Sequence, residues 1–223
     1  MDPMTQLALA TLVFLATHFV TSTPLRGKLV GMVGERPYLG LYSLVALVAL
    51  VWMVIAYGNA PLERLWGATR WLPVVVMPFS LVLLTTGYFR NPAAVMQGAL
   101  LKNPDPARGI VRVTRHPVMW AIMLWSGAHL LARGDVKSVL FFGAFFVVAG
   151  GGTILQDLRK ARTLGEDWAR FTAVSSNVPF LAILQGRNTL RLAEIGWAKP
   201  LGGIALYVIL LYAHAWLFGA PPY

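Results

Sequence analysis

The side chains best suited to chemistry in this chain are its four histidines, His18, His116, His129 and His214. The chain has no cysteine, which excludes thiolate ligands, thiol nucleophiles and disulfides. Metal chemistry would therefore use histidine, a carboxylate or tyrosine. Because an ionisable group is costly in lipid, a histidine within an apolar segment is a functional-site hypothesis by default.

Depth in the membrane separates the four histidines. His18 lies near the inner end of the first apolar run, and His116 opens the fourth run from the same side. His129 lies about 20 Å further along that helix, in the outer half, so one ion cannot bind both His116 and His129. His214 lies among aromatic residues near the outer end of the last run, and an interfacial aromatic belt explains it without a function.

Two interpretations of His18 and His116 stay open. In the first, the two imidazoles are axial ligands of one haem held between helices, and basic residues at the inner surface neutralise its propionates: Arg26, Lys28, Arg112 and Arg115. In the second, His18 hydrogen-bonds a neighbouring helix, and Arg115 and His116 contact lipid headgroups at a helix entrance.

The composition predicts the elements that must position these residues. Hydrophobic residues make up 57% of the 223 residues, charged residues only 13%, and the mean hydropathy is +0.63. One soluble core could not bury this much apolar surface, so lipid must cover the rest. We expect an all-α polytopic membrane bundle forming a single domain over residues 1–223. Six apolar runs are long enough to span: Thr5–Ser22, Tyr38–Tyr57, Trp71–Tyr88, Pro117–Ala132, Ser138–Leu155 and Pro200–Phe218.

Lysine and arginine set the expected topology. The connections after the first, third and fifth runs carry most of the 19 basic residues: Arg26, Lys28, Arg36; Arg90, Lys102, Arg108, Arg112, Arg115; Arg159, Lys160, Arg162, Arg170, Arg187, Arg191, Lys199. The other two connections hold Arg64, Arg70 and Arg133, Lys137. The positive-inside rule then places both termini outside. The net charge of +10 is therefore interpreted as topology, and no nucleic-acid partner is expected.

The long cytoplasmic segments, residues 89–116 and 156–199, are expected to hold further helix. Gly109–Arg115 is expected to be helical ahead of Pro117, and Asp157–Arg170 to be a solvated continuation of the fifth helix. Apolar stretches at Val178–Leu184 and Leu190–Ile195 predict short helices lying on the inner leaflet.

Smaller motifs have structural interpretations. Gly150, Gly151 and Gly152 predict close helix packing. The pair Arg133 and Asp135 is expected in a solvated outer turn. Glu166 and Asp167 are expected to be surface partners of nearby arginines: Arg162 and Arg170.

Several ordered motifs resemble the NnrU family, which includes NnrU proteins of denitrifying bacteria and is similar to the plant and cyanobacterial zeta-carotene isomerase. The motifs are Gly109 to Trp120 around Arg115-His116-Pro117, Gly127 to Asp135 around Ala128-His129, and His18 followed by Arg26. The last cytoplasmic loop adds Gly165 to Phe171 and Val178-Pro179-Phe180. The resemblance covers nearly the whole chain.

This resemblance implies a polytopic protein of a bacterial inner membrane and, in the isomerase branch, haem b with histidine ligands. By position, the first-helix histidine matches His18 and the Arg-His-Pro histidine matches His116, while a substrate-side or structural role is open for His129. The implied functions are haem- or nitric-oxide-linked metabolism, or haem-dependent cis-trans isomerisation of a lipophilic polyene. The implied partners are membrane lipids and a lipophilic or small gaseous ligand.

Two alternatives stay open. The Arg-His-Pro turn also resembles isoprenylcysteine-type methyltransferases, which implies S-adenosylmethionine-dependent methyl transfer to a small or lipophilic substrate. The other is a non-enzymatic haem-handling or structural role in the membrane.

Overall fold

The computed structural model describes residues 1–94 and 98–222, and all regular structure in these ranges is helical. One isolated antiparallel bridge joins Arg64 to Asp135. The all-α prediction is therefore confirmed. The helices are α1 Pro3–Val20, α2 Pro24–Val33, α3 Glu35–Asn59, α4 Trp71–Gly87, η1 Gly98–Lys102, η2 Gly109–Arg112, α5 Pro117–Arg133, α6 Val136–Ala173, α7 Leu181–Leu184, α8 Leu192–Ile195 and α9 Ala198–Phe218.

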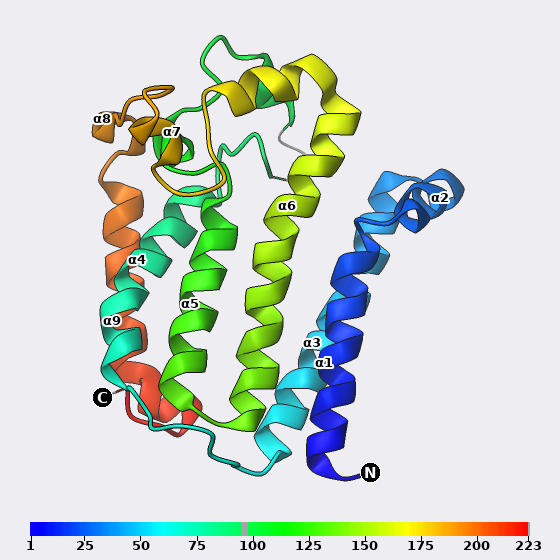
Figure 1. Ribbon diagram of the computed structural model, residues 1–223, viewed down its shortest axis with the longest axis vertical. Helices are drawn as coiled ribbons and strands as arrows, with labels where there is room; N and C mark the ends of the chain where they lie inside the picture. Colours follow the sequence, from blue (N-terminus) through cyan, green and yellow to red (C-terminus); the bar gives the residue numbers. More distant parts are fainter. Residues whose placement is uncertain (95–97, 223) are drawn as a thin grey trace.

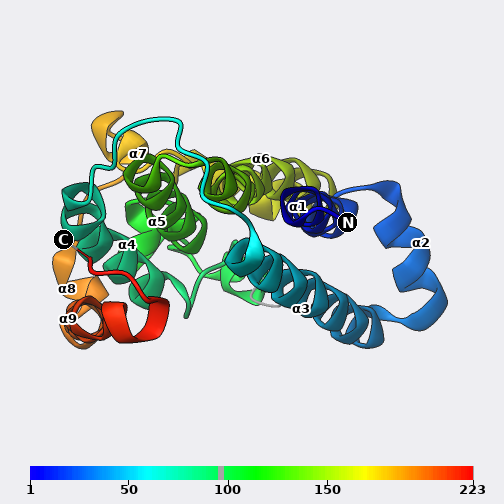
Figure 2. The same cartoon turned by 90° about the horizontal axis from the view of Figure 1, so that it is seen from below.

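The long helices run side by side along the longest axis, with both chain ends at the same end of the bundle (Figure 1). Helix α6 is central, since α5 packs on it from one side and α1 from the other (Figure 2). Helix α4 packs against both α5 and α9, while α3 packs mainly against α1. The chain therefore forms two helix groups, α1 with α3 and α4 with α5 and α9, that meet at α6.

Four helices are long and apolar enough to cross a membrane within the described residues: α1, α3, α6 and α9. Helices α4 and α5 have 17 residues each, and both coincide with predicted apolar runs. The outer face of α3 exposes large aliphatic side chains such as Leu44, Val48 and Ile55, as expected for a helix in contact with lipid. The prediction of membrane-spanning helices is thus confirmed, and the count of six stays a prediction.

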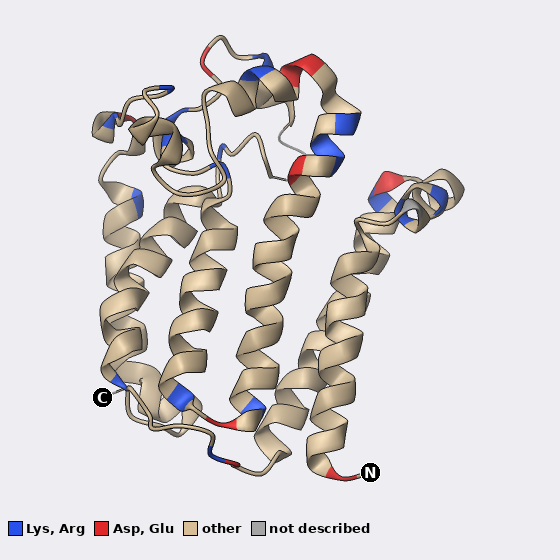
Figure 3. Ribbon diagram, in the orientation of Figure 1, with Lys and Arg blue, Asp and Glu red and all other residues tan. Residues whose placement is uncertain are grey.

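Basic and acidic residues gather mainly at the end of the bundle opposite the two chain ends (Figure 3). The expected interfacial helices lie there as α7 and α8, each four residues long. Asp167 pairs with Arg170 at 3.3 Å, as predicted. Helix α2 was not predicted; it begins at Pro24, a residue favoured in the first turn, and ends at Gly34 with φ +85°.

The expectation of helix over Gly109–Arg115 is wrong beyond Arg112. The 3₁₀ helix η2 ends there, and α5 begins at Pro117 after a non-helical break. His116 has φ −121° and ψ 52°, because the proline ring disfavours helical geometry in the residue that precedes it.

Two segments expected to be solvated contain buried side chains, although most residues of Asp157–Arg170 are exposed and continue helix α6 as predicted. The side chain of Asp135 is 1% exposed, because its carboxylate caps α6 by accepting a hydrogen bond from the Ser138 amide at 2.8 Å. In the C-terminal part of α6, Lys160, Trp168 and Phe171 are buried under the segment that follows α4. Lys160 donates to the carbonyls of that segment: Pro92, Ala93 and Ala94.

Small residues bring the helices together, as predicted for the glycine run. A Cβ atom on Gly151 would lie 3.1 Å from the ring of Phe19 in α1, and one on Gly150 would lie 3.4 Å from Met123 Sδ in α5. On α9, a Cβ atom on Gly203 would lie 2.8 Å from the Val82 Cα atom of α4. Close backbone approach therefore holds α6 and α9 to their neighbours.

Gly203→Ala is expected to destabilise the protein by about 1–3 kcal/mol, because the new methyl group must push the α4 backbone away. Thermal unfolding in detergent, followed by circular dichroism, measures the effect. Gly202→Ala is the matched control, since no atom lies within 4 Å of its Cβ position. Equal melting temperatures for the two variants would contradict this account of the α4–α9 contact.

Candidate functional site

A buried polar cluster joins the start of α5 to the inner part of α6. The Asp157 carboxylate of α6 lies 2.7 Å from His116 Nε2 and accepts from Arg115 through Nε at 2.9 Å and Nη2 at 2.6 Å. The His116 side chain is 2% exposed, and those of Arg115 and Asp157 are 14% and 19% exposed. An ionised carboxylate only accepts hydrogen bonds, so His116 donates from Nε2.

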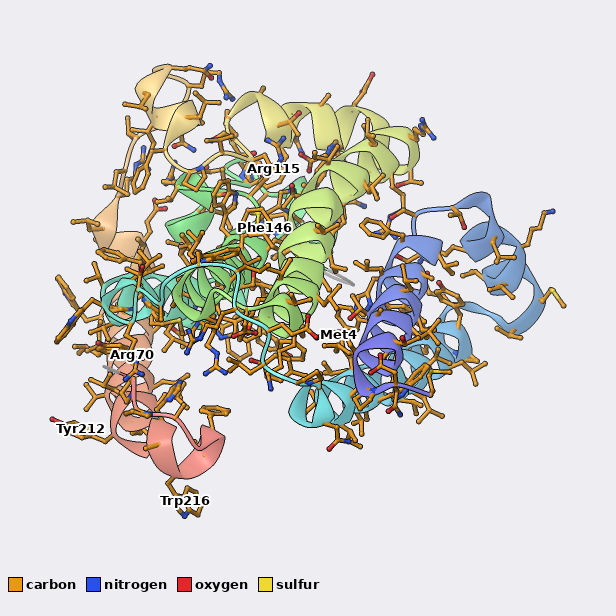
Figure 4. The ribbon with its side chains drawn as sticks, turned by 60° about the horizontal axis from the view of Figure 1, so that its bottom comes forward. Met4, Arg70, Arg115, Phe146, Tyr212 and Trp216 are labelled. Atoms are coloured by element: carbon orange, nitrogen blue, oxygen red, sulfur yellow. The ribbon has the colours of Figure 1, made fainter. Side chains whose placement is uncertain are left out.

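The segment 175–177 closes this cluster. The Arg115 amide donates to the Ser176 carbonyl at 2.9 Å, and Trp120 Nε1 donates to the Asn177 carbonyl at 2.9 Å. Asn177 in turn donates to the Thr153 hydroxyl of α6 at 2.9 Å. Arg115 lies near the end of the bundle where these elements meet (Figure 4). The Arg-His-Pro turn is thus fixed from several directions.

His18 has a different environment on α1. Its Nδ1 lies 2.8 Å from the Phe14 carbonyl one turn earlier, and its ring contacts Phe14 and Tyr42 at centroid distances of 4.2 Å and 6.2 Å. Among the described residues no hydrogen bond reaches its Nε2. A backbone carbonyl thus orients the ring and leaves Nε2 without a partner, which is compatible with metal binding but is also seen at His129.

His129 lies in an aromatic cluster in the outer half of α5 and α6. Its ring stacks on Phe142 at 5.3 Å and contacts Trp125 at 5.8 Å, and its Nδ1 lies 2.8 Å from the Trp125 carbonyl. Phe145 lies 5.0 Å from Trp125 and also 5.0 Å from Phe14 of α1. Aromatic rings therefore form a continuous apolar layer between His18 and His129.

His214 lies at the outer end of α9, 4.9 Å from the ring of Phe218, with Nδ1 2.7 Å from the Ala220 carbonyl. Tyr212 and Trp216 on the same helix point away from the bundle (Figure 4). These surroundings are those of an interfacial aromatic belt.

Three of the four basic residues expected to meet propionates bind carboxylates of this chain instead. Arg115 binds Asp157, and Arg26 binds Glu35 at 2.9 Å. Arg112 binds Glu194 in a bidentate pair, and its guanidinium also contacts Asp105 and Asn188. Lys28 is exposed on α2.

The pair of Arg112 and Glu194 is strong. Hydrogen bonds from Arg112 lower the pKa of Glu194 to about 2, and they raise the pKa of Arg112. The Gly109 amide adds a hydrogen bond to Glu194 at 2.9 Å. This pair fastens α8 to η2.

The fit of haem to these residues is partial. Among the described residues His18 Nε2 has no hydrogen-bond partner, which is compatible with an axial ligand. His116 has its Nε2 hydrogen-bonded to Asp157, so that nitrogen binds iron only if this bond is broken. The described residues contain no group of three or more histidine, aspartate or glutamate side chains that could hold a metal ion alone. The geometry thus fits His18 as a ligand and does not fit His18 and His116 as a preformed pair.

Two hollows lie near these residues. An apolar groove of about 230 Å³ lies between α4, α5 and α9, lined in part by Met77, Leu84, Trp125 and Leu210. Ser80 also lines the groove, but its hydroxyl donates to the Ala121 carbonyl at 2.8 Å. A larger cavity of about 480 Å³ lies at the end of the bundle opposite the two chain ends.

Sequence reasoning missed Asp157. It was treated as part of a solvated segment, yet it binds both Arg115 and His116. The available signal was scarcity, because the chain has only nine acidic residues against nineteen basic ones. An acidic residue two positions after an apolar run is then expected to have a basic partner.

The helices and buried imidazoles define a class of integral membrane protein with a polar cluster at one end and an aromatic interior. The chain belongs to the NnrU family, because the family model described as NnrU protein matches residues 6–222.

Two curated relatives are similar over most of the chain. The chloroplastic 15-cis-zeta-carotene isomerase of Arabidopsis thaliana is 26% identical over 201 residues, 85% of this chain and 54% of the relative. The maize (Zea mays) protein of the same name is 26% identical over 191 residues, 82% of this chain and 51% of the relative. The chain therefore spans about half the length of these relatives. No solved structure matches the chain significantly.

His116→Ala and Asp157→Asn are each expected to lower stability by about 1–3 kcal/mol, because each leaves a buried partner without its hydrogen bond. Thermal unfolding of the detergent-purified variants measures this. Glu166→Gln, on the exposed face of α6, is the control. If both cluster variants melt at the wild-type temperature, a structural role for the cluster is contradicted.

The Arg112–Glu194 pair predicts a pH dependence. Since the folded-state pKa of Glu194 is about 2, below its ordinary 4.5, the stabilisation is complete above about pH 4.5 and is lost as the pH falls through 2. The difference in melting temperature between the wild type and Glu194→Gln should be constant from pH 7 to 5 and shrink below pH 4. A difference that disappears by pH 5 would show that the pair does not hold the carboxylate ionised.

Proposed function

We propose that this protein is a membrane-embedded isomerase that changes the cis-trans geometry of a lipophilic polyene. The observation that carries the proposal is the similarity to 15-cis-zeta-carotene isomerases over 85% of the chain. By analogy with the names of these relatives, the substrate class is a carotenoid.

The apolar groove supports this proposal by its place and chemistry. It lies between α4, α5 and α9, and the one hydroxyl named in its wall is already hydrogen-bonded. A polyene carries no polar group and partitions into the bilayer, so a site for it needs an apolar wall reachable from lipid. Trp125 lines the groove and also contacts His129, which connects the groove to the aromatic layer.

The proposed cofactor is haem b, with His18 and His116 as its proposed ligands. The environment of His18 supports its proposed role as a ligand. His116 would have to give up its hydrogen bond to Asp157 before its Nε2 could bind iron. When bound, haem supplies an iron that is redox-active and, with an open position, binds ligands. The residues of this chain would orient the imidazole of His18 and exclude water with the rings of Phe14 and Phe145.

The proposed location is a bacterial inner membrane, with both termini on the periplasmic side. Two features support the orientation. The chain ends lie at the end of the bundle with few basic residues, and basic residues concentrate at the other end (Figure 3).

Wild-type protein, purified in detergent from haem-replete cells, is expected to show a Soret band and to isomerise 15-cis-zeta-carotene in liposomes in the dark. His18→Ala should lose the band and the activity, while His214→Ala should keep both. Absorption spectra of the oxidised and reduced protein and chromatography of the polyene isomers measure the two properties.

The outcomes separate the alternatives. A Soret band without isomerisation would indicate haem or nitric oxide handling. A colourless protein that does not bind added hemin but binds S-adenosylmethionine would indicate methyl transfer. For His116, loss of the band in His116→Ala but not in Asp157→Asn would support ligation, because the second variant leaves the imidazole in place.

A further inference from the structure

The cytoplasmic cavity is separate from the apolar groove and from the histidines. It lies between the end of α4, residues 89–92 and 100–111, α8 and the first turn of α9. Its volume of about 480 Å³ is in the range of sites that hold small organic ligands. The proposed isomerase function does not use it.

The charges that line this cavity are unbalanced. Its basic side chains are Arg90, Arg108 and Lys199, and its acidic side chains are Asp105 and Glu194. Both carboxylates bind Arg112, as the salt bridges show. Among the described residues, none of the three lining cations has a carboxylate within salt-bridge distance.

Glu194 also has little capacity left to bind a further cation. Glu194 accepts from Arg112 through both oxygens and from the Gly109 amide. Its pKa of about 2 shows that it stays ionised within this pair. The cavity therefore attracts an anion, since a cationic ligand would face three positive side chains.

The backbone fixes one of these cations at the cavity. Arg90 has φ +57°, one of two non-glycine residues with positive φ among the described residues. A non-glycine residue in this region costs of order 1 kcal/mol or more and persists only where the surroundings impose it. The turn after α4 thus presents Arg90 beside Phe89 at the cavity.

The cavity also has an apolar side. Phe89 is 60% exposed, and the Lys199 ammonium lies 6.0 Å from the centre of its ring. Ile110 and Leu100 extend this apolar wall. Since α4 ends and α9 begins here, the cavity lies where membrane-spanning helices meet the headgroup region (Figure 1). A ligand with a charged head and an acyl chain matches both walls.

We propose that this cavity binds the phosphate headgroup of an anionic lipid, with Arg90, Arg108 and Lys199 meeting the phosphate and Phe89 contacting the start of an acyl chain. Arginine and lysine are the usual phosphate ligands of proteins. An anion held by three exposed or half-exposed cations should also bind more weakly at high salt.

The test is isothermal titration of the detergent-purified full chain with dihexanoyl phosphatidic acid. Wild type is expected to bind it at least tenfold more tightly than dihexanoyl phosphatidylcholine, whose choline cancels the phosphate charge. It should also bind it at least tenfold more tightly than inorganic phosphate, which has no chain. Equal affinity for phosphatidylcholine would overturn the charge argument, and equal affinity for inorganic phosphate would overturn the lipid assignment.

The variants Arg108→Gln and Lys199→Gln should each weaken binding of phosphatidic acid about tenfold. The matched control is Arg162→Gln, an exposed arginine of α6 that does not line the cavity, and it should bind as wild type does. Melting temperatures of all variants check folding, and Lys199→Gln provides a second measurement if Arg108→Gln is unstable. Unchanged affinity in both cavity variants would overturn the proposal, whatever the result of the isomerase assay.

Discussion

One half-buried carboxylate, that of Asp157, joins the start of α5 to α6 at one end of this bundle. Lipid offers no water to a charged group, so a carboxylate at the end of a membrane helix must find its partners within the protein. Asp157 finds them in Arg115 and His116, and this choice fixes where α5 begins relative to α6. The 175–177 segment and Asn91 then attach to the same turn. This pairing thus joins four parts of the chain at the end of the bundle opposite the two chain ends.

Much of the fold was predictable because apolar runs in a membrane protein are long and must be helical. All six runs are helices, and the two interfacial helices lie in the predicted stretches. The predictions failed where one residue and its bonding partners determine the local structure or burial. Pro117 prevents helix at His116, Asp135 is buried because it caps α6, and Lys160 is buried because three free carbonyls surround it. The causes at His116 and Asp135 are local, since Pro117 and Ser138 lie close by in the sequence. The carbonyls around Lys160 come from a distant segment, which composition does not reveal.

The histidines show why the candidate site was only partly predictable. His18 and His129 are inside helices, so each ring nitrogen Nδ1 reaches a carbonyl one turn earlier and Nε2 stays available. His116 precedes its helix and has no such carbonyl, so its ring reaches across to α6 instead. Depth and residue type, which the sequence gives, placed His18 and His116 on the same side. The choice of ring partner depends on the neighbouring helix, which the sequence does not specify.

Gly165 interrupts α6 with φ +50° and ψ −124°. The helix that precedes it, from Val136 to Leu164, is roughly 43 Å long at 1.5 Å per residue, about the thickness of a bilayer with its headgroups. Beyond the glycine the chain turns and runs over the end of the bundle (Figure 1). The length of α6 before Gly165 therefore sets how far the segment beyond Gly165 lies from the start of the helix. Lengthening this helix by one turn would move the segment beyond Gly165 about 5 Å further along the bundle axis.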